Sequence, residues 1–286
     1  MVGSGKGSFA MRGQQLGAAL GARVVNAPTP ADWCWADVAV LIKRAALAHA
    51  KAARLAGVSV IWDALDFWRQ PADNDKSESD ARQLLASHVR DIAPILSIGA
   101  TRAMADALGG VYLPHHTWPG LTGSPVRSVV EVVGYEGNAS YLGTWRKALE
   151  RACARRGWRL VINPPDLRDL DIIVALRDGQ WDGWMCREWK SGVKIGNAIA
   201  AGRPLITQAS AAQRELAPVG TLIETVEELE GALDVWSPAA ARALALRQSS
   251  AASLTLPSVA ADYRILLERA TGRSAFGVSP EALCLA

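Results

Sequence analysis

Cysteine, long apolar runs and net charge are all scarce in this 286-residue sequence, and each scarcity excludes a class of protein. The four cysteines are scattered, with no CxxC pair and no histidine at metal-ligand spacing, which argues against a disulfide framework or a zinc site. No apolar run approaches the roughly 20 residues of a membrane span, and Met1 begins no signal peptide. The net charge of +3 permits an anionic ligand but does not by itself indicate nucleic-acid binding. We therefore expect a cytoplasmic protein that binds no metal.

Phenylalanine and tyrosine are also few, with three and four residues, whereas there are 11 tryptophans. Flat, amphipathic indole rings near a cleft suit sugars or bases, and packing in the core is an equally good explanation. Several of them fall in expected loops, namely Trp33, Trp35, Trp68, Trp118, Trp181 and Trp184. Half of the residues are apolar and 21% are charged, so the chain should fold as a globule with a sizeable core.

Short apolar segments alternate with helical patterns along the whole chain. In the first half we expect strands at 23–25, 38–42, 58–62, 95–98 and 111–113, with helices at 9–20, 44–56, 80–92 and 101–108. In the second half we expect strands at 129–133, 158–162, 171–175, 204–207 and 220–223, with helices at 140–156, 190–201, 225–233, 238–247 and 258–270 and another helix directly after the strand at 204–207. Such alternation predicts an α/β fold with parallel, buried strands.

The segment 118–127 is the best domain boundary, because it contains Pro119, Gly120, Gly123 and Pro125. We predict one domain at 1–125, a second at 126–272 and a C-terminal tail at 273–286. Each half opens on a strand followed by a glycine-containing turn and a helix. Ligands of parallel α/β sheets bind beyond the carboxyl ends of the strands, so a cleft between the two halves is the expected site.

A glycine-containing loop, with Gly5 and Gly7, leads into the first predicted helix. Such a loop before a helix N-terminus suits phosphate binding. It matches neither the Walker A motif nor Gly-x-Gly-x-x-Gly. Arg12, one to two turns into the helix, could reach back to the same anion. We expect Gly5, Gly7 and Arg12 to contact an anionic ligand.

Polar residues follow two of the predicted strands in the first half. Asp63 and Asp66 follow the strand at 58–62, and His115 follows the strand at 111–113. A carboxylate or an imidazole at such a strand end is placed to act as a general base or to hold substrate hydroxyls. The aspartates could equally cap a turn, and His115 could be a hydrogen-bonded structural residue.

The predicted helix at 190–201 carries Lys190, Lys194 and Asn197 at spacing i, i+4, i+7, which places them on one face. Two lysines in a first helical turn oppose the helix dipole, which favours anions there. An anion bound at that N-terminus would remove the conflict. The alternative is a solvated lysine face.

The segment Asn197-Ala-Ile-Ala-Ala-Gly202-Arg-Pro204-Leu-Ile206 resembles the Glu-Ala-Met-Ala-x-Gly-x-Pro-Val-Ile segment of GT-B glycosyltransferases. The opening at 3–17, the stretch at 63–71 and Trp189 to Lys194 are similar to small glycosyltransferase-like proteins of bacteria and phages. The resemblance implies two Rossmann-like domains facing each other across a cleft. It also implies metal-independent transfer of a sugar from a nucleotide-diphosphate sugar to an acceptor hydroxyl.

The resemblance further implies roles for individual residues. The diphosphate would lie on Lys190, Ser191 and Lys194, and the ribose on Asn197. The nucleoside would be bordered by Arg177, Gly134, Tyr135 and Glu136. Because some phage members decorate modified DNA bases, the acceptor could be a hydroxymethylated base in duplex DNA, in which case a phage-encoded chain would act in the host cytoplasm. The alternative is a GT-B-shaped protein that binds a nucleotide or DNA without turnover.

One departure from the family concerns the Glu-x7-Glu pair of its retaining branch, in which the second glutamate binds ribose. The corresponding residues here are Trp189 and Asn197, and Glu188 is one residue out of register. Asparagine can still hydrogen-bond a ribose hydroxyl, but the acidic pair is absent. Inversion and retention of configuration therefore both stay open.

Overall fold

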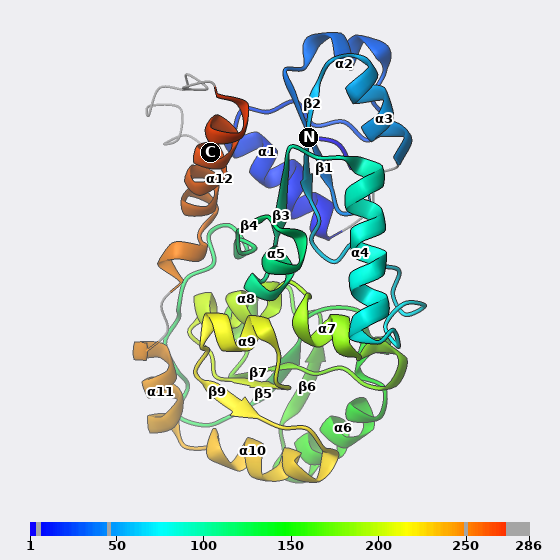
Figure 1. Ribbon diagram of the computed structural model, residues 1–286. Helices are drawn as coiled ribbons and strands as arrows, with labels where there is room; N and C mark the ends of the chain where they lie inside the picture. The colour runs from blue at the N-terminus through cyan, green and yellow to red at the C-terminus, as the bar shows by residue number, and fades with distance from the viewer. Residues whose placement is uncertain (4–6, 45–46, 249–250, 273–286) are drawn as a thin grey trace.

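The computed structural model describes residues 1–3, 7–44, 47–248 and 251–272, and it contains two parallel sheets, one in each half of the chain (Figure 1). The first sheet has the order β1-β2-β3-β4, and all of its neighbouring strands are parallel. Its strands are β1 (Val38–Ile42), β2 (Ser59–Asp63), β3 (Leu96–Gly99) and β4 (Val111–Tyr112). Of the expected strands at the chain start and at 23–25, only bridges from Val2 to Val25 and Leu41 form.

The second sheet has the order β6-β5-β7-β8-β9 and is also parallel throughout. Its strands are β5 (Val132–Tyr135), β6 (Arg159–Ile162), β7 (Ile172–Ala175), β8 (Leu205–Thr207) and β9 (Gly220–Leu222). The predicted α/β class with parallel strands is therefore confirmed, whereas burial holds for the other strands but not for β4, β6 and β9, which are partly exposed. In both sheets the strands are three to five residues long except β4, which has two.

Helices of the first half begin and end where capping residues predict. Ser77 accepts a hydrogen bond from the Asp80 N–H at the start of α4, and Thr101 accepts one from the Met104 N–H at the start of α5. Gly109, at φ 59°, ends α5 in the left-handed conformation. These helices are η1 (Ala10–Gln15), α1 (Leu16–Ala19), α2 (Pro30–Trp35), α3 (Leu47–Leu55), α4 (Glu78–Ile92) and α5 (Arg102–Leu108).

Helices of the second half follow the predicted order with one addition. They are η2 (Ala139–Leu142), α6 (Thr144–Arg156), η3 (Leu167–Asp169), η4 (Gly179–Trp181), α7 (Trp184–Glu188), α8 (Val193–Ala201), α9 (Ala211–Leu216), η5 (Val226–Glu228), α10 (Leu229–Val235), α11 (Ala239–Gln248) and η6 (Ala252–Leu254). Helix α7 was not predicted, and α8 begins at Val193 rather than at 190. Gly202, at φ 66°, ends α8 as expected.

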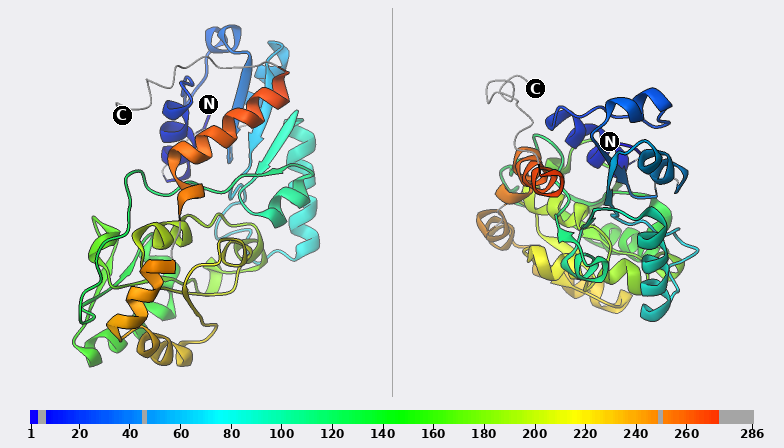
Figure 2. Two further views of the ribbon diagram at one scale, coloured as in Figure 1. Left: turned by 90° about the vertical axis from the view of Figure 1, so that its left-hand side faces the viewer. Right: turned by 45° about the horizontal axis from the view of Figure 1, so that its top comes forward.

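The last helix, α12 (Leu256–Thr271), packs on the first half of the chain (Figure 2). Val259, Tyr263 and Leu267 form a buried stripe at four-residue spacing and share a core cluster with Leu16 and Val40. The predicted second domain, 126–272, is corrected at this helix, because its apolar stripe covers the first sheet. The tail predicted at 273–286 lies outside the described residues. Among the residues that the structure describes, no helix is long and apolar enough to cross a membrane.

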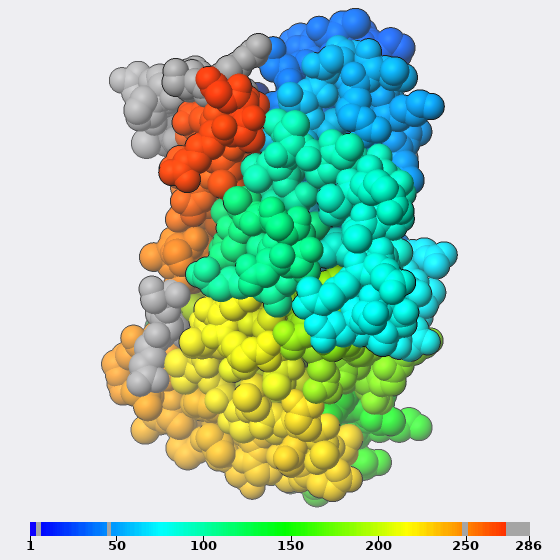
Figure 3. All heavy atoms as spheres, viewed as in Figure 1, coloured from blue at the N-terminus to red at the C-terminus, as the bar shows by residue number. Residues whose placement is uncertain are grey.

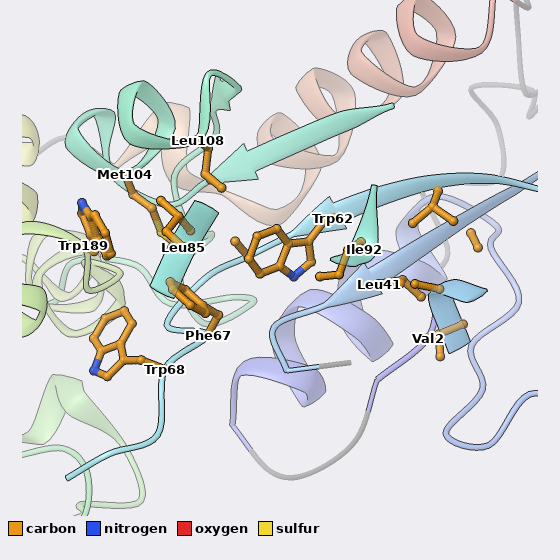
Figure 4. Close-up of a cluster of buried hydrophobic side chains, with 14 of the residues drawn as sticks. Val2, Leu41, Trp62, Phe67, Trp68, Leu85, Ile92, Met104, Leu108 and Trp189 are labelled. Carbon is orange, nitrogen blue, oxygen red and sulfur yellow. The ribbon is translucent and has the colours of Figure 1, made fainter. Parts of the chain in front are cut away.

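One hydrophobic cluster joins the two halves, which meet along a broad seam (Figure 3). Phe67 and Trp68 from the first half pack with Trp189 from the second (Figure 4), and Met185 belongs to the same cluster. The Nδ2 of Asn74 also donates to the carbonyl of Gln180 across the seam, at 2.7 Å. The segment that enters α8 is thereby anchored in the core of the opposite half.

Candidate functional site

A pocket of about 90 Å³ lies at the carboxyl ends of β7 and β8, against the N-terminus of α8. Arg177 enters it from the end of β7, and Lys190, Ser191 and Lys194 enter it from the segment that begins α8. We call it the α8 pocket. Its volume suits a phosphate-sized group, because pockets for whole small molecules enclose roughly 300–1,000 Å³. The first N–H groups of any α-helix have no partner within the helix, so α8 directs polar hydrogens into this pocket.

Among the residues the structure describes, no carboxylate forms a salt bridge with Lys194, although the charge of Glu136 favours its protonated form. Its Nζ donates to the hydroxyl of Tyr135 at 2.8 Å and lies 4.0 Å from the centroid of that ring. The side chain is half-buried. Burial, together with the charges of Arg177 and Lys190, lowers the pKa of Lys194 well below its usual value. An anion in the α8 pocket would stabilise the protonated form of this amine.

Lys190 precedes α8 and reaches toward the first half of the chain. Its Nζ donates to Asp66 Oδ2 at 3.0 Å, and the N–H of Ser191 donates to Asp66 Oδ1 at 3.3 Å. The predicted common helix face for Lys190, Lys194 and Asn197 is therefore corrected. Trp189 is buried in the core cluster of the opposite half and α8 begins only at Val193, so Lys190 lies before the helix. Burial lowers the pKa of Lys190 to about 8, although Asp66 opposes this shift.

Asp66 lies between two ammonium groups and is 5% exposed. Besides Lys190, the Nζ of Lys43 lies 3.5 Å from its Oδ2. Burial alone would raise the pKa of Asp66, but these two cations and the N–H of Ser191 hold it well below its usual value. The sequence analysis did not select Lys43 as a site residue. It directly follows β1, so the criterion that selected Asp63, a polar residue directly after a strand, would also have selected Lys43. Its φ of 57° is uncommon for a residue other than glycine.

Asn197 is fully buried, and protein groups occupy its amide. Its Nδ2 donates to Glu136 Oε2 at 3.0 Å, and its Oδ1 accepts from the backbone N–H of Trp118 at 3.0 Å. Glu136 follows β5, is half-buried, and also accepts from the indole N–H of Trp118 at 2.9 Å. That Asn197 meets the ribose stays a prediction, and in the structure its amide bonds to Glu136 and to the backbone N–H of Trp118.

Arg12 and Asp63 form a buried ion pair away from the α8 pocket. Arg12 Nε lies 3.1 Å from Asp63 Oδ2, and neither side chain has exposed surface. The guanidinium also donates to the carbonyls of Leu113, at 2.7 Å, and Pro114, at 3.0 Å. The expectation that Arg12 reaches a bound anion is therefore corrected, because core groups occupy its Nη atoms and pair with its Nε. Burial raises the pKa of Asp63, against the Arg12 charge and a hydrogen bond from Tyr263.

The other predicted site residues occupy varied environments. Gly7, at φ 62°, accepts the Met11 N–H at the start of the first helix and does not line the α8 pocket, and Gly5 lies outside the described residues. Gly134 is buried in β5, where a Cβ would lie 2.2 Å from the side chain of Leu170. It therefore permits close packing against Leu170, and its expected contact with the nucleoside stays a prediction. Arg177 has its guanidinium 5.0 Å from the ring centroid of Tyr141.

His115 and His116 are buried beside each other at the end of β4. Burial and the charge of Arg12 lower the pKa of His115 to about 3 and that of His116 to about 4. Both imidazoles are therefore neutral near pH 7. His116 Nε2 lies 3.0 Å from the side-chain oxygen of Gln15. A base with a conjugate acid this strong takes a proton weakly, so His115 is a poor candidate for general-base catalysis.

No protein-family model and no curated protein matches this sequence. Among solved structures, the fold is similar to that of Anabaena Alr3699/HepE in complex with UDP-glucose, with a TM-score of 0.60, 13% identity, and coverage of 94% of this chain and 98% of that one. It is also similar to AviGT4, a glycosyltransferase involved in avilamycin A biosynthesis, with a TM-score of 0.51, 14% identity, and coverage of 89% and 81%.

A third similar structure is the UDP-forming α,α-trehalose-phosphate synthase of Burkholderia xenovorans in complex with glucose-6-phosphate. Its TM-score is 0.52 at 12% identity, with coverage of 82% of this chain and 74% of that one. At such identities the likeness concerns the fold. The chain has a GT-B glycosyltransferase-like fold, as the sequence resemblance predicted.

Proposed function

We propose that this protein is a glycosyltransferase that moves a sugar from a nucleotide-diphosphate sugar to an acceptor hydroxyl. The observation that carries the proposal is the position of Lys194, which lies at the N-terminus of α8 without a salt bridge to any described carboxylate, in a pocket that Lys190 and Arg177 also line. The GT-B-like fold supports it, because a similarly folded protein was solved with UDP-glucose. No metal is needed in this scheme, since lysine and arginine side chains supply the positive charge.

The chemistry follows from where the leaving group carries its charge. When the bond between the sugar and the diphosphate breaks, negative charge develops on the departing phosphate oxygen. Cations and helix N–H groups already oriented toward that oxygen stabilise this charge without further rearrangement. We assign this role to Lys190, Lys194 and the N–H groups that begin α8, with Arg177 beside them.

Of the candidate bases, Asp66 is the one that bonds to residues lining the α8 pocket. Its carboxylate bonds to Lys190 and Ser191, which are two of the groups that we assign to the diphosphate. Among the charges near Asp66, that of Lys190 lowers its pKa most. If a bound diphosphate pairs with Lys190 instead, the pKa of Asp66 should rise. The carboxylate then becomes a stronger base for an acceptor hydroxyl, as an inverting reaction requires. Asp63 is less suitable because it is enclosed with Arg12.

The replacement Lys194→Met tests the proposal, because it removes the charge and keeps most of the volume. We expect Kd for UDP or GDP, measured by calorimetry, to rise roughly 10- to 100-fold, the value of a hydrogen bond to a charged group. Lys147→Met is the matched control, since Lys147 is exposed on α6. Equal affinities of the Lys194→Met variant and the unaltered protein would contradict the proposal.

A protein of this shape that binds a nucleotide without turnover is the competing hypothesis, and release of the nucleoside diphosphate separates the two. A panel of UDP- and GDP-sugars incubated with and without acceptor alcohols should yield free UDP or GDP. Binding without release in every combination would favour the non-catalytic alternative. The hydroxymethylated DNA base stays a prediction for the acceptor. If it is correct, DNA binding should weaken steeply as salt is added.

A further inference from the structure

A pocket of about 370 Å³ lies beside the first residues of β1, in the first half of the chain. Its lining is mostly apolar, with Leu20 directly after α1, Val38 and Val40 from β1, and Leu267 from α12. Residues of α2 complete the lining, so we call it the α2 pocket. Its volume falls within the roughly 300–1,000 Å³ of pockets that hold whole small molecules. The α2 pocket is therefore large enough for a ligand of its own.

The α2 pocket is separate from the α8 pocket, and the two share no lining residue. Strands β1 and β2 are paired in parallel, with Val38 beside Ser59 and Ile42 beside Asp63. Val38 lines the α2 pocket, whereas Asp63 lies at the other end of the sheet, four residues of strand or about 13 Å away. Figure 1 shows α2 at the top of the molecule and α8 near its middle. A ligand in the α2 pocket therefore lies outside the site that we propose for sugar transfer.

Asp32 brings a buried carboxylate to this apolar lining, with 8% of the residue exposed. Its Oδ2 accepts hydrogen bonds from the backbone N–H and the hydroxyl of Thr29, both at 2.7 Å. These bonds hold the pKa of Asp32 below its usual value, so the side chain is ionised at neutral pH. Its Oδ1 forms an ion pair with Arg23, whose Nη2 lies 2.8 Å away, but accepts no hydrogen bond among the described residues. One oxygen of a buried carboxylate therefore retains the capacity to accept a hydrogen bond.

Arg23 shows that this place accommodates a cation. Its guanidinium carbon lies 5.8 Å from the ring centroid of Trp35, which is within the range of a cation–π contact. The side chain of Arg23 is 53% exposed and Trp35 is 64% exposed. Ion pairs with an exposed partner contribute little to stability. A ligand cation can therefore take the place of the guanidinium at small cost.

The charges that line the α2 pocket favour a cation over an anion. Two carboxylates, those of Asp32 and Asp37, face one guanidinium, that of Arg23. The Met1 amine also lines the pocket, but burial lowers its pKa to about 6, so it is mostly neutral near pH 7. The lining therefore carries a net negative charge, which attracts an ammonium ion and repels a carboxylate.

We infer that the α2 pocket binds an organic cation with an apolar body, namely an amine that is protonated at pH 7 and carries a ring or a short alkyl chain. The ammonium group replaces Arg23 between Asp32 Oδ1 and the ring of Trp35. The apolar body lies against Leu20, Val40 and Leu267. This inference goes beyond the proposed function and does not depend on it.

Calorimetry on the full chain at pH 7 tests the inference with three indole compounds. Tryptamine carries an ammonium group, tryptophol carries a hydroxyl in its place, and indole-3-propionate carries a carboxylate. We expect Kd for tryptamine to be roughly 10- to 100-fold lower than for tryptophol, the value of a hydrogen bond to a charged group. Indole-3-propionate should bind more weakly than either of the other two.

Replacements in the pocket show where the amine binds. In Asp32→Asn the preference for tryptamine over tryptophol should disappear, whereas Asp106→Asn, which changes an exposed aspartate on α5, should keep it. Arg23→Gln should lower Kd for tryptamine by about two- to fivefold, because the ligand no longer displaces a weak ion pair. Trp35→Ala should raise it by about two- to fivefold, the value of an exposed cation–π contact.

Urea unfolding of each variant checks that the fold is kept, since Asp32 also caps α2. If Asp32→Asn does not fold, Arg23→Gln and Trp35→Ala still decide, because both residues are exposed.

The outcomes that would overturn the inference are distinct. If tryptamine does not bind, or binds no better than tryptophol, the pocket does not select a cation. Tighter binding of indole-3-propionate that is lost in Arg23→Gln would make Arg23 the anchor and the ligand an anion. Unchanged tryptamine binding in a folded Asp32→Asn variant would place the amine elsewhere. None of these results concerns nucleotide-sugar binding, so the proposed function stands or falls separately.

Discussion

The carboxylate of Asp66 competes with any phosphate for Lys190 and Ser191, because it bonds to both. We predict that Asp66→Asn lowers Kd for UDP or GDP by a factor on the order of ten. In the unaltered protein the Asp66 carboxylate occupies these donors and must be displaced by the ligand, whereas in the variant more of the molecules have the donors free. Asp106→Asn is the matched control, because Asp106 is exposed on α5. A weaker affinity of Asp66→Asn in calorimetry would show that Asp66 supports the donor site and does not compete with it.

His115 and His116 should make the fold sensitive to acid. Their folded pKa values, about 3 and about 4, lie below the unfolded value of 6.5. The unfolded chain therefore binds more protons between these values, so stability is complete above pH 6.5 and falls as the pH drops toward 4 and 3. At pH 5 each imidazole should lower the free energy of unfolding by about 2 kcal/mol.

Urea unfolding at pH 7 and pH 5 measures this effect, and His116→Gln should reduce the difference between the two pH values. Glutamine keeps a polar group beside Gln15 and does not titrate. An equal loss of stability in the variant and in the unaltered protein would assign the acid sensitivity to other groups.

Helix α7 and the residue after it connect the α8 pocket to the opposite half. Trp189 is fully buried among Phe67, Trp68 and Trp184, and Lys190 follows it directly. We predict that Trp189→Ala lowers the free energy of unfolding by about 3–5 kcal/mol, as large-to-small core replacements do. It should also weaken nucleoside diphosphate binding, because Lys190 loses the anchor that holds it beside the pocket.

Trp236→Ala separates these two effects. Trp236 is also buried, at 7% exposure, but it belongs to the core of the second half and is remote in sequence from Lys190. We expect a comparable loss of stability from it, measured by urea unfolding, with unchanged nucleotide affinity. Parallel losses of affinity in both variants would mean that Trp189 acts only through general stability.

Several connections hold the two halves of the molecule together, among them the following three. The linker leads from β4 to β5, the Phe67–Trp189 cluster closes one side, and α12 returns from the second half to cover the first sheet (Figure 2). Each half also has a core of its own, and the Phe67–Trp189 cluster joins the two. This arrangement keeps Asp66 and Lys190, which are 124 residues apart in the chain, within hydrogen-bonding distance.

Local pattern alone predicted most of the elements. The strand expected at 38–42 is β1, and the helices that end at Gly109 and Gly202 end where glycine adopts positive φ. These features depend on residues near one another in the chain, namely apolar alternation and capping. The lysine at the start of α8 and the strand-end position of Asp66 were also visible, because both follow from the element order.

By itself, the sequence determined an α/β fold with lysine side chains near the start of one helix. The tertiary structure decided what each polar side chain contacts. Asp63 and Asp66 are three residues apart and looked equivalent, yet one pairs with Arg12 in the core and the other with Lys190 at the seam. Likewise, the bond from Asn197 to Glu136 could not be predicted from the sequence. The reason is physical: burial and pairing are set by residues up to 200 positions away, as for Tyr263 and Asp63, and local periodicity contains no information on such partners.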